Sequence, residues 1–194
     1  MARVGFKIAK YNLHDEEAGK LKALTGNSVP VFEKVIDEKF SPNYANAELY
    51  ANDGLAEHDD SFIDGTLSIT IADDEDKFVA TIFGQTITTE GEVTSNENDI
   101  APELSYGHIV PKMYNGSKKY KVEFFPRVRF TKITSDNKTK GQSIEFNTSS
   151  LEGKVMRLEK AFNGLKEGDW EKHQTFDTLS AATTYLDGLL SPSA

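Results

Sequence analysis

The sequence predicts a mainly β fold in which two antiparallel sheets pack on each other, as a β-sandwich or barrel-like body, with one flanking α-helix. Apolar and polar residues alternate with a period of two through several segments, which is typical of half-buried strands. Helical spacing is confined to two short segments. A chain of 194 residues with 38% hydrophobic content can fill one core, so we expect a single domain over residues 1–194.

The first alternating segment spans residues 31–40. Its apolar residues are expected on one face: Phe32, Ile36 and Phe40. Its polar residues are expected on the other: Glu33, Asp37 and Lys39. A second strand places its apolar residues together in the same way: Ile63, Leu67, Ile69 and Ile71. Both segments predict antiparallel strands with one solvated face.

A third strand is predicted over residues 120–130, as one arm of a long hairpin. Its apolar residues are expected to share a face: Tyr120, Val122, Phe124, Val128 and Phe130. After a turn at residues 135–141, Ile144 and Phe146 continue the pattern. Pro126 has no N–H to donate to a ladder, so we expect a bulge or an edge position there.

Two helices are expected. Residues 74–83 begin with acidic side chains, which suit a helix N-terminus, and end before Gly84. The apolar stripe of this helix should pack on a sheet: Phe78, Val79, Ile82 and Phe83. Residues 178–190 follow Asp177 as the expected N-cap and predict a terminal helix or a partly ordered arm.

The remaining segments are expected to be loops or chain ends. Residues 12–28 and 91–102 are polar and long enough to be interaction loops. Residues 1–11 are expected to form an N-terminal arm or strand, and residues 168–194 a C-terminal extension. The first residues lack the apolar stretch of a signal peptide, and no membrane-spanning run occurs, so we expect a cytoplasmic setting without membrane contact.

The charge is unevenly distributed along the chain. The net charge is −9. Residues 48–103 hold fifteen acidic residues and one basic residue, whereas residues 104–166 hold thirteen basic and five acidic residues. One interpretation is ordinary surface patchiness, and the other is that acidic and basic surfaces of identical copies meet head to tail.

We find no sequence pattern for catalysis, a cofactor or a metal. The chain has no cysteine, which excludes thiolate sites. The histidines lack metal-ligand spacing: His14, His58, His108 and His173. The acidic run at residues 73–76 lacks the pattern of a calcium loop, and no phosphate-binding or nucleophile-elbow motif occurs. We therefore expect a protein without catalytic activity.

Several segments resemble, in order and spacing, the major tail tube proteins of long-tailed bacteriophages. They are MARVGF (1–6), AELYANDGLAEHDDSFIDGTLSITIADDEDKFVATIFG (47–84), DIAPELSYGHIVPK (99–112) and the stretch from YKVEFFPRVRF to TKGQSIEFNTSSLEG (120–153). The resemblance covers roughly the first four fifths of the chain. It does not extend over residues 168–194.

The resemblance implies a β-sandwich that forms hexameric rings, which stack around a tape-measure protein into a hollow tube. The implied partners are copies of the same chain, the tape-measure protein, and the tail terminator and distal tail proteins. DNA would cross the lumen without specific binding, which an acidic wall favours. The implied location is the virion tail, assembled in the host cytoplasm.

Within such a tube we expect Glu33, Asp37 and Glu48 to face the lumen. Polar loops and chain ends are expected to contact neighbouring subunits, including a turn at residues 41–43 and a loop at residues 52–60. The expected contact residues are Arg3, Phe6, Ser41, Pro42, Asn43, Asp53, His58 and Asp59.

A second function class stays open on the sequence alone. A small acidic β-sandwich could act as a monomeric binding module, for example a carbohydrate-recognising accessory domain. The aromatic residues available for stacking on a sugar would then be Trp170, Tyr106 and Tyr114. Trp170 is the single tryptophan, and its context in EGDWEKH also fits a structural anchor.

Overall fold

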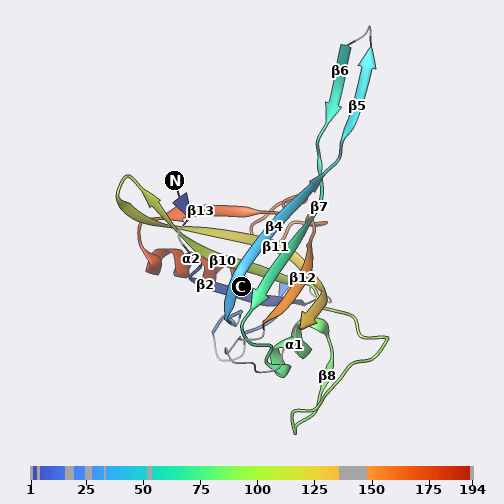
Figure 1. Ribbon diagram of the computed structural model, residues 1–194, viewed down its shortest axis with the longest axis vertical. Coiled ribbons are helices and arrows are strands. Elements are labelled where there is room, and N and C mark those ends of the chain that lie inside the picture. Colours follow the sequence, from blue (N-terminus) through green and yellow to red (C-terminus); the bar gives the residue numbers. More distant parts are fainter. Residues whose placement is uncertain are drawn as a thin grey trace, which may run out of the picture.

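The computed structural model describes residues 2–3, 5–15, 20–24, 28–32, 34–51, 54–135 and 148–192. Over these residues the chain is mainly β, with two helices, which confirms the predicted fold class (Figure 1). The elements are β1 (Ala2–Arg3), β2 (Ile8–Asp15), β3 (Lys20–Leu21), β4 (Val35–Tyr44), β5 (Ala47–Ala51), β6 (Gly54–Asp59), β7 (Phe62–Ile71), α1 (Asp76–Phe83), β8 (Thr86–Ile87), β9 (Val93–Thr94), β10 (Leu104–Tyr114), β11 (Ser117–Ser135), β12 (Ser149–Val155), β13 (Lys172–Phe176) and α2 (Leu179–Leu190).

The two expected layers are halves of one hydrogen-bonded antiparallel sheet rather than separate sheets. Its strand order is β3-β2-β10-β11-β12-β7-β4, with β1 beside β10 and β13 beside β11. The 19-residue strand β11 belongs to both halves. Its first part pairs with β10 and β13, and its last part pairs with β12. The strands of the two halves run in different directions and cross in Figure 1.

A β-bulge at Pro126 separates the two parts of β11. On β10 and β11, Tyr106 pairs with Phe125 and Leu104 pairs with Val128. Two residues along β10 therefore correspond to three residues along β11. The bulge expected at Pro126 is therefore confirmed. The extra residue reverses the alternation, because side chains on a strand change face at every residue.

The single apolar face predicted for residues 120–130 is consequently wrong. Before the bulge, Val122 and Phe124 face α2, in one hydrophobic cluster. After it, Val128 and Phe130 belong to the cluster between the sheet halves, together with Phe125. Residues 144 and 146, expected to continue the strand, lie outside the described residues.

The main core lies between the two sheet halves and under α1. The Phe32 ring contacts the rings of Tyr106, Phe130 and Phe78. Phe78 and Ile82 of α1 are buried in this core, and Val79 and Phe83 pack against it half-buried, as the helical spacing predicted. Gly84 ends α1 in the left-handed conformation, with φ of 68°.

The second cluster lies between α2 and the β2–β10–β11 surface. Ala182, Leu186 and Leu190 of α2 are fully buried there. The N-cap is Thr178 and not the predicted Asp177, since the Thr178 hydroxyl accepts a hydrogen bond from the Ala181 N–H at 3.2 Å. The terminal segment is thus a packed helix rather than a partly ordered arm.

The last turn of α2 is bound to the sheet side by two asparagines. Asn12 Nδ2 donates to the Leu190 carbonyl at 2.9 Å, and Asn163 Nδ2 donates to the Leu189 carbonyl at 2.7 Å. Carbonyls at a helix C-terminus have no partner within the helix, so these amides satisfy them.

Several local predictions near β4 are wrong. The strand begins at Val35, after Lys34 with φ of 39°, and Ile36 lies at a bulge with 53% exposure instead of facing inward. Residues 41–43 continue β4 and form no turn, and residues 54–59 are strand β6 rather than a loop. Ile63 is also exposed, because it is the extra residue at a second register shift, where Asn43 pairs with Asp64 but Tyr44 pairs with Phe62. The predicted loops at 12–28 and 91–102 contain parts of β2, β3 and β9.

We predict that Phe78→Ala destabilises the protein by about 3 to 5 kcal/mol, because it removes a ring that is 6% exposed and touches the rings of Tyr11 and Phe32. The measurement is urea unfolding followed by circular dichroism. Lys77→Ala, on the exposed side of the same helix, is the control and should change the free energy of unfolding by less than about 0.5 kcal/mol. Equal stability of the two variants would show that the stripe is not core.

Candidate functional site

A long hairpin extends from the body of the protein. Strands β4 and β7 run on into β5 and β6, which project away from the main sheet and both helices (Figure 1). Trp170 stacks on Phe62 at the base of this hairpin, with ring centroids 4.2 Å apart and an interplanar angle of 9°. Trp170 also contacts Phe40, at 5.7 Å between ring centroids. The base of the hairpin is thereby fixed to the core, and Trp170 is a structural anchor.

One face of the β4–β7–β12 sheet half is polar and has no helix over it in the described part of the chain. Its rows run across three strands: Asp37 beside Thr70 and Ser150, Lys39 beside Ser68 and Glu152, and Ser41 beside Thr66 and Lys154. The opposite face carries the buried residues Leu67, Ile69 and Leu151. Among the described residues β4 pairs with β7 alone, so the other edge of β4 borders this polar face.

The residues expected to face a lumen fall into three groups. Asp37 lies on the polar face of β4 and is exposed. Glu48 is exposed on β5, within the projecting hairpin. Glu33 lies outside the described residues. The structure does not bring Asp37 and Glu48 into one cluster, since they belong to different parts of the β4–β5 arm.

The expected contact residues are similarly dispersed. Ser41, Pro42 and Asn43 are exposed on β4, and His58 is exposed on β6. Asp59 lies in β6, Arg3 lies in β1 opposite Lys112, and Asp53 is outside the described residues. Phe6 is half-buried, and its ring stacks within the chain on His108, with ring centroids 5.3 Å apart.

A groove of about 630 Å³ lies between β4 and the β10–β11 strands. A chain of buried polar groups crosses its floor. Tyr106 Oη donates to Glu38 Oε2 at 2.6 Å, and His108 Nε2 lies 3.1 Å from Glu123 Oε2. Lys121 Nζ lies 2.5 Å from Glu123 Oε1. His108 Nδ1 lies 3.2 Å from Glu38 Oε1, within ion-pair distance but outside hydrogen-bond geometry.

These groups are buried and bind one another. The side chains of His108, Glu38 and Glu123 are 3%, 7% and 8% exposed. The cluster thus connects β4, β10 and β11 by charge and hydrogen bonds, and we interpret it as a structural link between the sheet halves.

The pKa values of two members reflect this environment. Burial by itself would raise the pKa of Glu123, but hydrogen bonds from His108 and Lys121 outweigh it and hold that pKa far below its ordinary value of 4.5. Burial and the nearby Glu38 carboxylate raise the pKa of Tyr106 well above 10.0. Tyr106 therefore stays a neutral hydrogen-bond donor.

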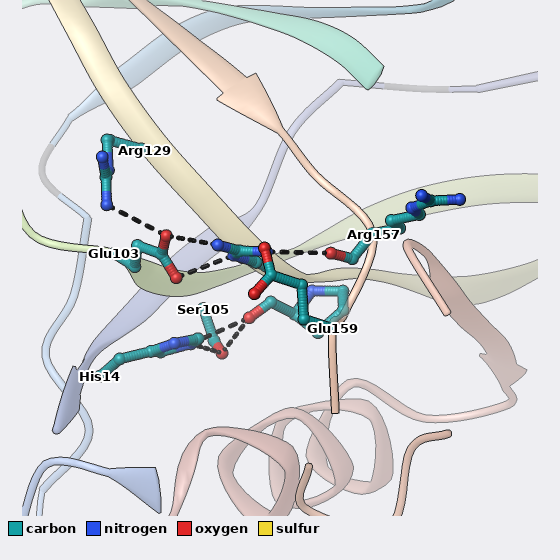
Figure 2. A network of polar contacts seen from close by, with 8 residues as sticks. His14, Glu103, Ser105, Arg129, Arg157 and Glu159 are labelled. Carbon is teal, nitrogen blue, oxygen red and sulfur yellow. Dashed lines mark hydrogen bonds and ion pairs between the residues drawn. The ribbon is translucent and has the colours of Figure 1, made fainter. Parts of the chain in front are cut away.

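A second polar network surrounds the bulge in β11 (Figure 2). Glu103 accepts two hydrogen bonds from Arg127, from Nε and Nη2, both at 2.8 Å, and one from Arg129 Nη2 at 3.0 Å. Arg127 Nη1 also binds Glu159 Oε1 at 2.7 Å. Burial would raise the pKa of Glu103, but the two guanidinium groups lower it overall.

Ser105 and His14 complete this network without forming a nucleophile. Ser105 Oγ is buried and donates to the Pro126 carbonyl at 2.7 Å. His14 Nε2 lies 3.0 Å from both Ser105 Oγ and the Pro126 carbonyl, so it must carry a proton to bind them. Both side chains therefore bind the backbone at Pro126 and hold the bulge in place.

Sequence reasoning treated the four histidines as isolated and so missed both networks. His108 meets carboxylates from positions 38 and 123, which are far from it in sequence. The available signal was Glu123 and His108 within otherwise apolar strands, because a buried charge requires a partner. Over the described residues no three His, Asp or Glu side chains are arranged to hold a metal ion, and no helix is long and apolar enough to cross a membrane.

Comparison with protein-family models and with curated proteins finds no match. The function is therefore inferred from the geometry above and from the sequence resemblance.

We predict that the two carboxylates on Arg127 differ strongly in their contribution to stability. The Glu103 side chain is 16% exposed and binds two arginines, whereas that of Glu159 is 74% exposed. Glu103→Gln should cost about 1.5 to 3 kcal/mol of unfolding free energy. Glu159→Gln, the matched control, should cost less than about 1 kcal/mol. Denaturant unfolding checks this, and equal losses would contradict the role assigned to Glu103.

We predict that Glu123 makes stability sensitive to acid. Its pKa is lowered in the folded state, so its stabilising contribution is complete above about pH 4.5 and is lost as the pH falls toward the folded value. The measurement is the free energy of unfolding from about pH 7 to about pH 3. Glu123→Gln should be less stable at neutral pH but show a shallower acid slope. Glu97→Gln, an exposed control, should keep the wild-type slope.

Proposed function

We propose that this chain is a structural subunit of a bacteriophage tail tube, in which hexameric rings stack around a tape-measure protein into a hollow tube that conducts DNA. The observation that carries the proposal is the polar face of the β4–β7–β12 sheet half, which no described helix covers. It is bordered by the edge of β4 that has no partner among the described strands, and the projecting β5–β6 hairpin continues it. The resemblance of the sequence to major tail tube proteins is an independent reason for it.

The polar face has the properties that a DNA channel requires. Its hydroxyl groups and mixed charges keep it wet, and its described residues form no continuous row of cations that would retain phosphates. Among the residues named on this face, the carboxylates of Asp37 and Glu152 balance the ammonium groups of Lys39 and Lys154. A β4 edge that pairs with a neighbouring subunit would also remove the hazard of an unpaired edge strand.

The proposed partners are copies of this chain, the tape-measure protein, and the tail terminator and distal tail proteins. DNA passes through without specific binding. The proposed location is the virion tail, with assembly in the host cytoplasm. The function requires no catalytic step, and the buried polar groups are assigned to the fold.

The alternative is a monomeric carbohydrate-binding module. It has less support, because Tyr106 is buried and the Trp170 ring already stacks on the Phe62 ring of the same chain. Tyr114, at 46% exposure, remains accessible for stacking on a sugar. Of the three candidate stacking residues, one is therefore buried and one is already stacked within the chain.

We predict that the pure protein forms rings or tubes at about 0.1 M salt and that tubes shorten at about 1 M salt, as the Debye length falls from about 10 Å to about 3 Å. Size-exclusion chromatography and negative-stain imaging measure assembly, and circular dichroism measures folding at each salt concentration. Folding should stay unchanged, because its main contribution is apolar burial. A monomer at all concentrations that binds glycans would replace this proposal with the alternative.

A further inference from the structure

Two asparagine–glycine pairs of this chain lie in turns of the same kind. Asn115 and Gly116 have φ of 46° and 78°, and Asn163 and Gly164 have the same two values. Positive φ at both central residues defines a type I′ turn, for which asparagine followed by glycine is the preferred sequence. The residues around the two pairs also match, as YNGSK and FNGLK. Local sequence and backbone conformation therefore make the two sites equivalent.

Asparagine followed by glycine is also the pair in which an asparagine most readily loses its side-chain amide. The glycine backbone nitrogen attacks the asparagine Cγ, the C–N bond of the side-chain amide breaks, and ammonia leaves with the proton of the attacking nitrogen. The product is a five-membered succinimide ring. One water then adds to either ring carbonyl and opens the ring, which gives aspartate or isoaspartate. Glycine permits the attack because it has no Cβ to obstruct the approach.

Each turn must open before this reaction can occur. In a type I′ turn the glycine nitrogen points away from the asparagine side chain, since the asparagine is in the left-handed conformation. The attacking nitrogen reaches Cγ only after the asparagine backbone rotates. The rate at each site is therefore proportional to the fraction of time that its turn is open. The contacts that hold each turn closed decide which asparagine reacts.

The turn at Asn115 and Gly116 has few contacts that hold it closed. It lies at the end of the β10–β11 hairpin, where Tyr114 pairs with Ser117. All residues from 113 to 118 are exposed. In the described part of the chain, no other residue hydrogen bonds to the Asn115 side-chain amide. Opening this turn disturbs only the end of the ladder, where local opening costs little free energy.

The second turn is held closed by helix α2. Asn163 Nδ2 donates to the Leu189 carbonyl at 2.7 Å and to the Ser191 carbonyl at 3.4 Å. Across the turn, the Phe162 N–H donates to the Leu165 carbonyl at 3.0 Å, and the Leu165 N–H donates to the Phe162 carbonyl at 2.8 Å. Leu165 is also buried in the cluster under α2. Opening this turn therefore breaks the bonds to α2 and disturbs the packing of Leu165.

We propose that Asn115 is a site of spontaneous deamidation in the folded protein and that the packing of α2 protects Asn163 from the same reaction. The reaction consumes only water, so it is independent of the proposed tube function. Two additional hydrogen bonds and the burial of Leu165 oppose opening at Asn163, so Asn115 should react at least about tenfold faster.

Deamidation changes both the charge and the backbone of the hairpin end. Each event replaces a neutral amide by a carboxylate, in a turn that is followed by Lys118 and Lys119. Isoaspartate also leads the backbone through the side-chain carbon, which lengthens a turn whose geometry requires two residues. Aged protein should therefore contain molecules that differ in net charge and in the order of the β10–β11 turn.

The test compares the two asparagines within one sample of the full chain. Folded protein is incubated at mildly alkaline pH, which favours attack by the backbone nitrogen, and is then digested with trypsin. Cleavage after lysine releases residues 113–118 and 161–166, which hold one Asn-Gly pair each. Mass spectrometry measures the deamidated fraction of each peptide, and a sample digested before incubation gives the background. The fraction in 113–118 should grow at least about tenfold faster.

Two controls assign this difference to the structure. In chain unfolded by guanidinium chloride the two peptides should react at similar rates, because neither turn is formed. Leu189→Ala removes a buried side chain from the last turn of α2, so it should raise the deamidated fraction in 161–166 and leave that in 113–118 unchanged. Circular dichroism confirms that this variant is folded.

The proposal is overturned if Asn115 stays intact in the folded wild type while it reacts in the unfolded chain. Equal rates for the two peptides in the folded wild type also overturn it. A folded Leu189→Ala variant in which residues 161–166 stay as protected as in the wild type would show that α2 is not the protecting element.

Discussion

The bulge at Pro126 is the constraint on which both hydrophobic clusters depend. A regular β11 would present the same face along its whole length, so Phe124 and Val128 would lie on one side. The additional residue turns the strand over, so that Phe124 contacts α2 and Val128 contacts the core between the sheet halves. One strand can thereby serve two cores on opposite faces. The Glu103 and Ser105 networks surround this point because it is where the ladder is interrupted.

The uneven charge of the chain is partly neutralised by ion pairs within the fold. Glu103, from the acidic segment 48–103, binds Arg127 and Arg129 from the basic segment 104–166, and Asp64 binds Lys154. Other charged side chains are exposed at several places, including the β5–β6 hairpin, the β10–β11 turn, the start of α1 and residues 90–97. Charge asymmetry along a sequence therefore does not by itself distinguish internal pairing from a contact between molecules. To distinguish the two, one must know which charged side chains form ion pairs within the folded chain.

The sequence was sufficient for properties that depend on local pattern. The fold class, the position and buried stripe of α1, and the bulge at Pro126 follow from periodicity, from Gly84 and from the missing proline N–H. Properties that depend on distant residues did not follow. The bulge reversed the faces of β11, Lys34 with a positive φ interrupted the strand expected over 31–40, and Glu38 met His108 across the groove. None of these three features is indicated by the pattern of residues next to it in the sequence.

The attachment of α2 has a consequence for biogenesis. Asn12 and Leu190, which share a buried hydrogen bond, are 178 residues apart in sequence. The apolar surface made by Ile109, Val122 and Phe124 is covered by this helix, which follows β10 and β11 in the sequence. A nascent chain that already contains β10 and β11 but not yet α2 therefore exposes this apolar sheet surface to solvent. Such non-local closure slows folding and makes the incomplete chain vulnerable to aggregation. A chain truncated before α2 would keep this exposed apolar surface.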